Sequence, residues 1–328
     1  MTRAKAKQKT AAKKRTAKRT KPAAPSLAPP VAPVVEPACA KINLFLHILG
    51  KRKDGYHLLD SLVVFADVHD TIEVRPAKSL SLTVKGPFAA ALKKSGATRN
   101  NLVLRAARAL QKAAKVRSGA AIALTKRMPV ASGIGGGSAD AAATLRALAR
   151  LWQLNVDDAA MAKIGLALGA DVPVCLAGKA AYVGGVGDAL APASVLPAAP
   201  MVLVNPGIAV PTKTVFKRRT GAFSEPGRFA DPARNATALG ILLARTHNDL
   251  TVPALGIAPV IADIIARLFA QPGCSIARMS GSGATCYGIF ETDAQAEAAA
   301  AALRAMHRKW WVQQTQLVAD TAAVAPIW

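Results

Sequence analysis

Apolar residues recur along most of this chain in the two periods that mark strands and helices. Runs of consecutive or alternating apolar residues predict strands at 39–49, near 62–65, and at 71–74, 80–84 and 121–124. The stretch Ser-Leu-Thr-Val within the fourth of these alternates strictly, which is typical of a strand with one buried face. We therefore expect the first part of the protein to form a sheet.

Helical periodicity follows, and capping residues mark where it begins. Asn100 or Asn101 can supply the N-cap of a first helix, and Asp157 or Asp158 the N-cap of a third. The third helix should stop at Gly169, because glycine readily ends a helix. Helices are accordingly expected at about 101–117, 138–152 and 157–169.

Beyond a hairpin-like segment at 181–188 and a Pro-rich stretch, a second region begins. Its apolar pattern predicts strands at 201–206, 275–279 and 285–290. It predicts helices near 234–246, 258–270 and 294–306. This order predicts a ferredoxin-like split βαβ arrangement. We place the boundary near 198, which gives an N-terminal domain at 38–198 and a C-terminal domain at 199–328, and an α+β fold class overall.

The net charge of +24 is unevenly distributed. Ten lysines and arginines and no acid lie within residues 1–21, so the rest of the chain carries +14. Residues 22–37 are rich in Pro and Ala, and we expect all of 1–37 to be a disordered tail. Such a tail can make weak, salt-dependent contacts with nucleic acid, but no specific nucleic-acid partner is expected.

Composition also bears on location and redox state. No apolar run approaches the roughly 20 residues of a membrane-spanning helix, so no membrane partner is expected. No apolar stretch follows the N-terminal charges, as a secretory signal requires, and we expect a cytoplasmic protein. The four cysteines are scattered without a Cys-x-x-Cys pair, which predicts reduced structural thiols rather than zinc or a disulfide framework.

The most informative segment is the glycine-rich stretch at 129–140, Pro-Val-Ala-Ser-Gly-Ile-Gly-Gly-Gly-Ser-Ala-Asp. Glycines let backbone amides curl around an anion, and the helix start that follows is electropositive. The segment therefore predicts a phosphate-binding loop. A Walker loop would end in Gly-Lys followed by Ser or Thr, and a dinucleotide fingerprint needs a third glycine where Ser138 stands, so neither fits.

Two residues of this segment restrict where the amide donors can lie. Ala131 and Ser132 carry Cβ atoms, so both positions cannot need a positive φ. The run from Gly133 to Ser138 is therefore the better candidate for cradling phosphate.

The glycine-rich segment resembles the ATP loop of the GHMP kinases. Three more segments resemble motifs of that superfamily in the same order, beginning at Ala40 (AKINLFLHILGKRKDGYHLLDS), Gly169 (GADVP) and Met279 (MSGSGATCYGIF). Together they cover the chain from about residue 38 onward. The resemblance implies an ATP-dependent small-molecule kinase with the two-domain fold of the superfamily, in which a mixed α/β N-terminal domain holds the ATP loop. Magnesium is expected with the ATP.

The resemblance also implies the reacting residues. It assigns Asp171 as the group that orients and deprotonates the substrate hydroxyl, and Lys41 as its charged partner. Phosphoryl transfer through a loose transition state needs mainly positioning and charge neutralisation, which an adjacent carboxylate and ammonium can supply. A structural ion pair is the simpler alternative.

Contacts to the nucleotide are implied for the loop and for two residues near it. Asn101 and Lys126 match positions near the adenosine, although a helix cap and a strand end explain them equally well. The Ser138 hydroxyl is the candidate magnesium ligand; Asp140 is another, but an acid at a helix start usually interacts with the helix dipole. The implied ATP-binding residues are Asn101, Lys126, Pro129, Val130, Ala131, Ser132, Gly133, Ile134, Gly135, Gly136, Gly137, Ser138 and Ala139.

Substrate choice rests on the segment Asp-Gly-Tyr-His at 54–57. It resembles the segment of a GHMP branch whose substrate is a cytidine diphosphate-linked polyol of isoprenoid precursor biosynthesis. Tyr56 would stack on the cytosine and His57 would bond its edge. Phe216 is implied as a second aromatic wall and Asn43 as a polar substrate contact; an exposed turn and a core phenylalanine are the simpler alternatives. The Ser-Gly-Ser-Gly run at 280–283 is expected to be a substrate-side packing loop.

Two other functions are compatible with parts of the sequence. Homoserine, mevalonate and sugar kinases share the glycine loop and the last motif, but lack an Asp-Gly-Tyr-His segment after an Ala-Lys-Ile-Asn-Leu strand. A nucleic-acid-binding protein that uses its basic tail is the remoter alternative, because such binding is independent of sequence and needs no folded partner.

Overall fold

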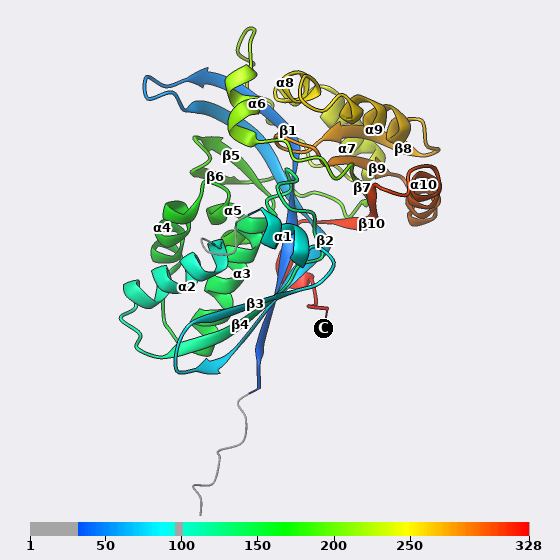
Figure 1. Ribbon diagram of the computed structural model, residues 1–328. Coiled ribbons are helices and arrows are strands. Elements are labelled where there is room, and N and C mark those ends of the chain that lie inside the picture. The colour runs from blue at the N-terminus through cyan, green and yellow to red at the C-terminus, as the bar shows by residue number, and fades with distance from the viewer. Residues whose placement is uncertain (1–31, 96–100, 328) are drawn as a thin grey trace, which may run out of the picture. The chain divides into compact units, whose positions relative to one another are not determined.

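The computed structural model describes residues 32–95 and 101–327, and the chain from Ala32 onward forms one compact unit (Figure 1). Most of the predicted tail, residues 1–31, lies outside the described residues. Its last four residues do not behave as predicted, because strand β1 (Val34–Lys51) already begins there. Val34 pairs with Val74 and Pro37 with Thr71, so the prediction that disorder extends to residue 37 is wrong for Val34–Pro37.

Strands β1 and β2 (His57–Ala77) are the longest strands described, and β1 pairs in antiparallel fashion with residues 57–74 of β2. The strands predicted near 62–65 and at 71–74 are both parts of β2. The pairing register shifts between Cys39 and Ala40 and again between Asn43 and Phe45. Such bulges redirect side chains and are common beside active sites. Here they flank Lys41 and Asn43, two of the predicted site residues.

The described strands join into one sheet with the order β3-β4-β2-β10-β7-β9-β8, while β1 and β5 also pair with β2 and β6 pairs with β5. Strand β10 was not predicted, yet it pairs with both β2 and β7 and so connects the two halves of the sheet. The domain boundary near 198 remains a prediction. The remaining strands are β3 (Ser81–Lys85), β4 (Gly119–Thr125), β5 (Ala181–Gly185), β6 (Ala189–Pro192), β7 (Pro200–Asn205), β8 (Cys274–Met279), β9 (Cys286–Phe290) and β10 (Trp311–Val318).

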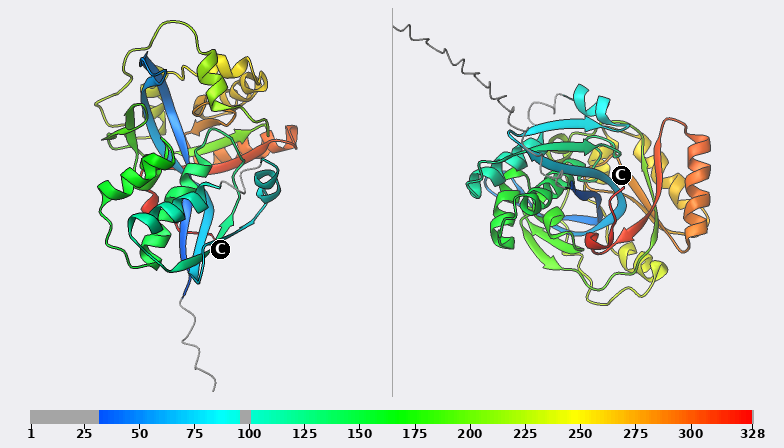
Figure 2. Two further views of the ribbon diagram at one scale, coloured as in Figure 1. Left: turned by 60° about the vertical axis from the view of Figure 1, so that its left-hand side comes forward. Right: turned by 90° about the horizontal axis from the view of Figure 1, so that it is seen from below.

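The helices gather in two groups on either side of β1 and β2 (Figures 1 and 2). Helices α2, α3 and α4 lie together in the cyan and green half, and α9 and α10 cover β7–β9 in the yellow to red half. The described helices are α1 (Ala89–Lys94), α2 (Leu102–Ala113), α3 (Gly136–Leu151), α4 (Asp158–Leu168), α5 (Val172–Ala177), α6 (Thr212–Arg218), α7 (Ala236–Ala244), α8 (Thr251–Leu255), α9 (Val260–Phe269) and α10 (Asp293–Met306).

Capping residues begin these helices where the sequence predicts them. The Asn101 side chain accepts a hydrogen bond from the backbone N–H of Val103, and Asp157 accepts one from Ala160, so each satisfies a free amide of a first turn. Gly169 follows α4 as expected, but with an extended φ of 169°. It therefore ends the helix without the left-handed conformation that favours glycine there.

The C-terminal half has the predicted split βαβ arrangement. Strands β7, β8, β9 and β10 occur in this order along the chain but lie side by side as β10-β7-β9-β8, with neighbours antiparallel. Among the described helices, none is long and apolar enough to cross a membrane.

Candidate active site

A cleft of about 1250 Å³ brings together four segments that are distant in the sequence. They are the middle of β1, the β1–β2 turn, the glycine-rich loop before α3, and α6 with the residues after it. All the predicted site residues line this cleft except Ile134 and Ala139. The side chains of those two residues are buried in the hydrophobic core, so only their backbone atoms belong to the loop.

The glycine-rich loop makes backbone approaches that a side chain would block. A Cβ atom at Gly133 would lie 2.7 Å from the carbonyl oxygen of Gly283, and φ there is +78°. At Gly135, where φ is +63°, it would lie 3.1 Å from Cβ of Lys41. Ala131 also has a positive φ of 53°, despite its Cβ, whereas Ser132 does not. The loop then passes directly into α3, whose first turn faces the cleft.

The loop is held by hydrogen bonds from β1 and from the Ser-Gly-Ser-Gly segment. The backbone N–H of Lys41 donates to the carbonyl of Ile134 at 3.0 Å, and that of Thr285, which follows the Ser-Gly-Ser-Gly segment, donates to the carbonyl of Ser132 at 3.0 Å. The Ser280 hydroxyl donates to the carbonyl of Gly133 at 3.2 Å and accepts from the N–H of Asn43 at 3.1 Å. This segment therefore braces the loop against β1.

Lys41 and Asp171, which both line the cleft, form an ion pair of 3.0 Å. The two side chains differ in accessibility, because that of Lys41 is 5% exposed and that of Asp171 is 48% exposed. Asp171 precedes α5 at its N-cap position but makes no capping hydrogen bond with its side chain. Its carboxylate is thus free to face both the ammonium and an incoming hydroxyl group.

Asn43 lines the same cleft and has an unpaired acceptor in its side chain. Its side-chain Nδ2 donates to the Ser61 hydroxyl at 2.8 Å, which in turn donates to the carbonyl of Phe45. These bonds fix the orientation of the amide. The Oδ1 atom of Asn43 is buried and has no hydrogen-bond partner in the described structure. A buried acceptor of this kind is costly unless a ligand satisfies it.

The β1–β2 turn carries the predicted base-binding residues. Tyr56 is 65% exposed, and its backbone N–H donates to Asp54, which stabilises the turn. The rings of His57 and Phe216 lie 5.3 Å apart at 35°, so the structure brings these two predicted residues into direct aromatic contact. Burial lowers the pKa of His57, and the positive charge of Lys51 lowers it further.

Lys126 is the centre of a buried charged cluster that sequence reasoning did not predict. Its Nζ donates to Asp70 at 2.5 Å and to Asp140 at 2.8 Å, and the three side chains are at most 5% exposed. Burial raises the pKa of Asp140. Asp140 thus pairs with Lys126 across the glycine loop, which is neither of the roles considered for it. Asp70 immediately precedes the strand predicted at 71–74 and lies among other polar residues such as Asp67 and Glu73, so no sequence signal distinguished it.

Asp70 also fixes the backbone that leads into the loop. Its Oδ1 accepts the N–H groups of Arg127 at 2.5 Å and Met128 at 2.9 Å. Its other oxygen, Oδ2, accepts from Lys126, which also donates to Asp140 on α3. The carboxylate of Asp70 on β2 therefore holds the residues before the glycine loop directly and the helix after it through Lys126.

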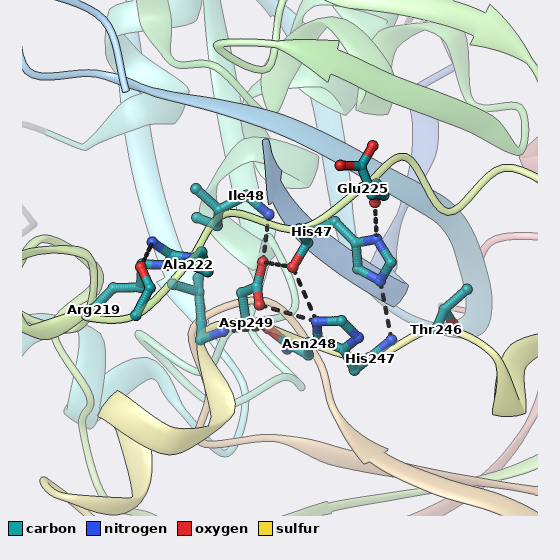
Figure 3. Close-up of polar contacts among 12 residues, drawn as sticks. His47, Ile48, Arg219, Ala222, Glu225, Thr246, His247, Asn248 and Asp249 are labelled. Atoms are coloured by element: carbon teal, nitrogen blue, oxygen red, sulfur yellow. Dashed lines mark hydrogen bonds and ion pairs between the residues drawn. The ribbon is translucent and has the colours of Figure 1, made fainter. Parts of the chain in front are cut away.

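The segment after α6 is tied to β1 by a second polar network (Figure 3). The ring of His47 bonds the carbonyl of Glu225 through Nδ1 at 2.7 Å and accepts the N–H of His247 through Nε2 at 3.1 Å. Asp249 accepts the N–H of Ile48 at 2.6 Å and the hydroxyl of Ser224 at 2.8 Å. This network positions the segment that carries Arg219 and Phe223 on the cleft wall.

Comparison with known proteins defines the class. The GHMP kinases N terminal domain model matches residues 101–179, and the GHMP kinases C terminal model matches residues 230–309. A crystal structure of homoserine kinase from Cytophaga hutchinsonii shares the fold, with a TM-score of 0.67 at 16% identity over 88% of this chain and 95% of that one. The fold is that of the GHMP kinases.

More similar relatives define the family within that class. Proteins named 4-diphosphocytidyl-2-C-methyl-D-erythritol kinase from Rhodospirillum rubrum and Paramagnetospirillum magneticum are each 52% identical to this chain, over 88% and 86% of it and 93% and 97% of their own lengths. A crystal structure of 4-(cytidine 5'-diphospho)-2C-methyl-D-erythritol kinase has a TM-score of 0.69 at 35% identity, covering 86% of this chain and 98% of that one. The chain belongs to the 4-diphosphocytidyl-2-C-methyl-D-erythritol kinase family.

Proposed function

We propose that this protein transfers the γ-phosphoryl group of ATP to the 2-hydroxyl of 4-diphosphocytidyl-2-C-methyl-D-erythritol, a step of the non-mevalonate route to isoprenoid precursors. The single observation that carries the proposal is the 3.0 Å pair of Lys41 and Asp171 in a cleft shared with the glycine loop and the β1–β2 turn. The names of the relatives at 52% identity support the same substrate.

The two charged residues divide the work of the transfer. Asp171 orients the substrate hydroxyl and accepts its proton as the oxygen bonds to the γ-phosphorus and the bond to the β-phosphate oxygen breaks, releasing ADP. The ammonium of Lys41 offsets negative charge on the attacking oxygen and on the transferring group. The unpaired Oδ1 of Asn43 can accept a hydrogen bond from a second hydroxyl of the polyol, which would hold the reacting one in place.

ATP would place its phosphates on the glycine loop. The amides from Gly133 to Ser138 and the first turn of α3 supply donors and a positive helix end. Magnesium usually binds to phosphate oxygens with only one or two protein ligands, and the Ser138 hydroxyl fits that role because it lines the cleft at the loop. Asp140 fits it less well, since Lys126 already occupies one of its oxygens. Bound magnesium would neutralise charge on the phosphates.

The cytidine would lie at the β1–β2 turn. Tyr56 offers an exposed ring for stacking, and Phe216 holds His57 by aromatic contact. Because burial and nearby cations lower the pKa of His57, its ring is neutral near pH 7 and can both donate and accept a hydrogen bond at the base edge. The predicted cytoplasmic location remains a prediction.

The test is a substrate panel with ATP, comparing the cytidine diphosphate-linked erythritol with mevalonate and homoserine. Only the first should be phosphorylated. Asp171→Asn should retain the fold and ATP binding while kcat falls by roughly 10² to 10⁴, the usual contribution of a positioned acid–base group. Lys41→Ala should be comparably damaging, and the double variant no worse than either, because both side chains act on one transferring group. Phosphorylation of mevalonate or homoserine instead would reject the proposed substrate.

A further inference from the structure

The charges that line the cleft do not balance. Each carboxylate among the described lining residues is already paired with a cation, at 2.7 to 3.0 Å: Asp54 with Arg52, Asp140 with Lys126, and Asp171 with Lys41. Four further cations line the same cleft, namely Lys51, Lys213, Lys217 and Arg219. These four remain as an excess of positive charge.

The excess cations have no anionic partner in the part of the chain that the structure describes. The ammonium groups of Lys51, Lys213 and Lys217 make no hydrogen bond or ion pair there. Arg219 donates only to the backbone carbonyls of Gly221 and Ala222 and lies 4.8 Å from the Phe223 ring centroid. Like charges gathered in one cleft repel one another, and a bound anion relieves that repulsion.

The position of Lys213 follows from what helix α6 touches at its two ends. At its start, the Thr212 hydroxyl bonds to Ser282 at 2.8 Å, in the segment that also contacts Asn43. Near its other end, Phe216 packs on His57. Lys213 and Phe216 are three residues apart on one helix face, so their Cβ atoms lie about 5–6 Å apart. Lys213 therefore lies between the polyol end of the cleft and the base-binding turn.

The other cations continue this wall toward the base. Lys51 pairs directly with His57 in the β1–β2 ladder. Lys217 follows Lys213 by one helical turn, and Arg219 comes directly after α6. A substrate that spans from Asp171 to Tyr56 has a polyol at one end and a nucleoside at the other. The group that links these two ends must lie beside Lys213.

We propose that Lys213 is a specificity-determining residue that binds the diphosphate of the substrate, with Lys217 adding positive charge behind it. The inference rests on the proposed function and deepens it, because it states how the enzyme distinguishes a nucleoside diphosphate-linked alcohol from its nucleoside or monophosphate counterpart. The lysine ammonium is a mobile point charge that suits a diphosphate free to rotate about its bridging oxygen.

The experiment measures direct binding of cytidine, CMP and CDP by calorimetry to the wild-type protein and to Lys213→Gln. In the wild type each added phosphate should tighten binding, most clearly at low salt. In Lys213→Gln the gain from CMP to CDP should shrink about tenfold, as expected for one charge-assisted contact at a solvent-facing site. The KM for ATP should remain within about twofold of the wild type, because ATP lies on the glycine loop.

Arg218→Gln is the matched control. Arg218 is on the same helix and loses the same charge, but it does not line the cleft and instead donates to the carbonyl of Gly256. It should bind CDP like the wild type. An unchanged CMP-to-CDP gain in Lys213→Gln, or an equal loss in Arg218→Gln, overturns the inference. Failure of the wild type to phosphorylate the cytidine substrate would reject the proposed function instead, since the binding series needs no turnover.

Discussion

Replacing Asp70 with asparagine should destabilise the protein and weaken ATP binding together. Asp70 is fully buried, and it shares the Lys126 ammonium with Asp140 while accepting two backbone N–H groups that lead into the glycine loop. The asparagine side chain would keep an oxygen for those two amides. It would turn an NH2 group or a neutral oxygen toward the ammonium, so the variant removes one charge and little else.

The expected magnitude follows from burial. Removing one partner of a buried ion pair costs about 3–5 kcal/mol, because it leaves an uncompensated charge. Asp140 remains as a second acceptor at 2.8 Å, so we expect the lower end, about 3 kcal/mol of the free energy of unfolding. Asp70→Ala should be worse by about 1–3 kcal/mol, since the two amides would also lose their acceptor.

Urea unfolding followed by circular dichroism measures this loss, and steady-state kinetics measures the effect on the loop. The KM for ATP should rise more than the KM for the alcohol, because both flanks of the glycine loop depend on Asp70. Glu73→Gln is the control on the same strand: its 2.7 Å pair with Arg75 is at the surface and should contribute about 0–1 kcal/mol. If Asp70→Asn unfolds within about 0.5 kcal/mol of the wild type, the cluster does not hold the loop as argued.

Three further predictions concern other parts of the molecule. Tyr56→Ala should lose roughly 1–3 kcal/mol of cytidine-substrate binding with the KM for ATP nearly unchanged; weaker ATP binding instead would move the turn to the nucleotide side. Deleting residues 1–31 should leave kcat and the unfolding midpoint nearly unchanged. Deleting residues 1–37 should lower the midpoint, because Glu36 pairs with Arg146 and Arg150; equal midpoints for the two deletions would contradict this. Burial lowers the pKa of His47 below 6.5, so below pH 6.5 the unfolded state binds more protons than the folded state. The free energy of unfolding should therefore fall as the pH drops below 6.5. This fall should be less steep in His47→Gln.

The site could be predicted from sequence wherever its chemistry is local. The glycine run at 133–137 and the Asp-Gly-Tyr-His turn are short segments whose conformations follow from glycine and turn residues, and both line the cleft. The caps at Asn101 and Asp157 were likewise readable, because a side chain within three residues decides them.

Elements that depend on distant partners could not be predicted in this way. Residues 34–37 have the composition of a spacer, but pairing with β2 and the ion pairs of Glu36 outweigh that tendency. Strand β10 reads Trp-Val-Gln-Gln-Thr-Gln-Leu-Val, in which glutamines interrupt the apolar alternation. It is nevertheless a strand because β2 and β7 offer backbone partners on both sides.

Ion pairs between residues distant in the sequence could not be predicted from spacing. The solvent accessibility of each partner distinguishes the roles that these pairs can have. The ammonium of Lys126 and the carboxylate of Asp70 are at most 3% exposed, so neither can exchange its partner for a ligand without stranding a buried charge. In the pair of Lys41 and Asp171 the ammonium is equally hidden, but the carboxylate is 48% exposed and can lose water to a hydroxyl group while keeping its cation. Lys213 is exposed and unpaired in the described structure, so its partner must come from solution. The three lysines line one cleft, and the roles we propose for them, structural support, catalysis and substrate recognition, differ in which charge is left facing the solvent.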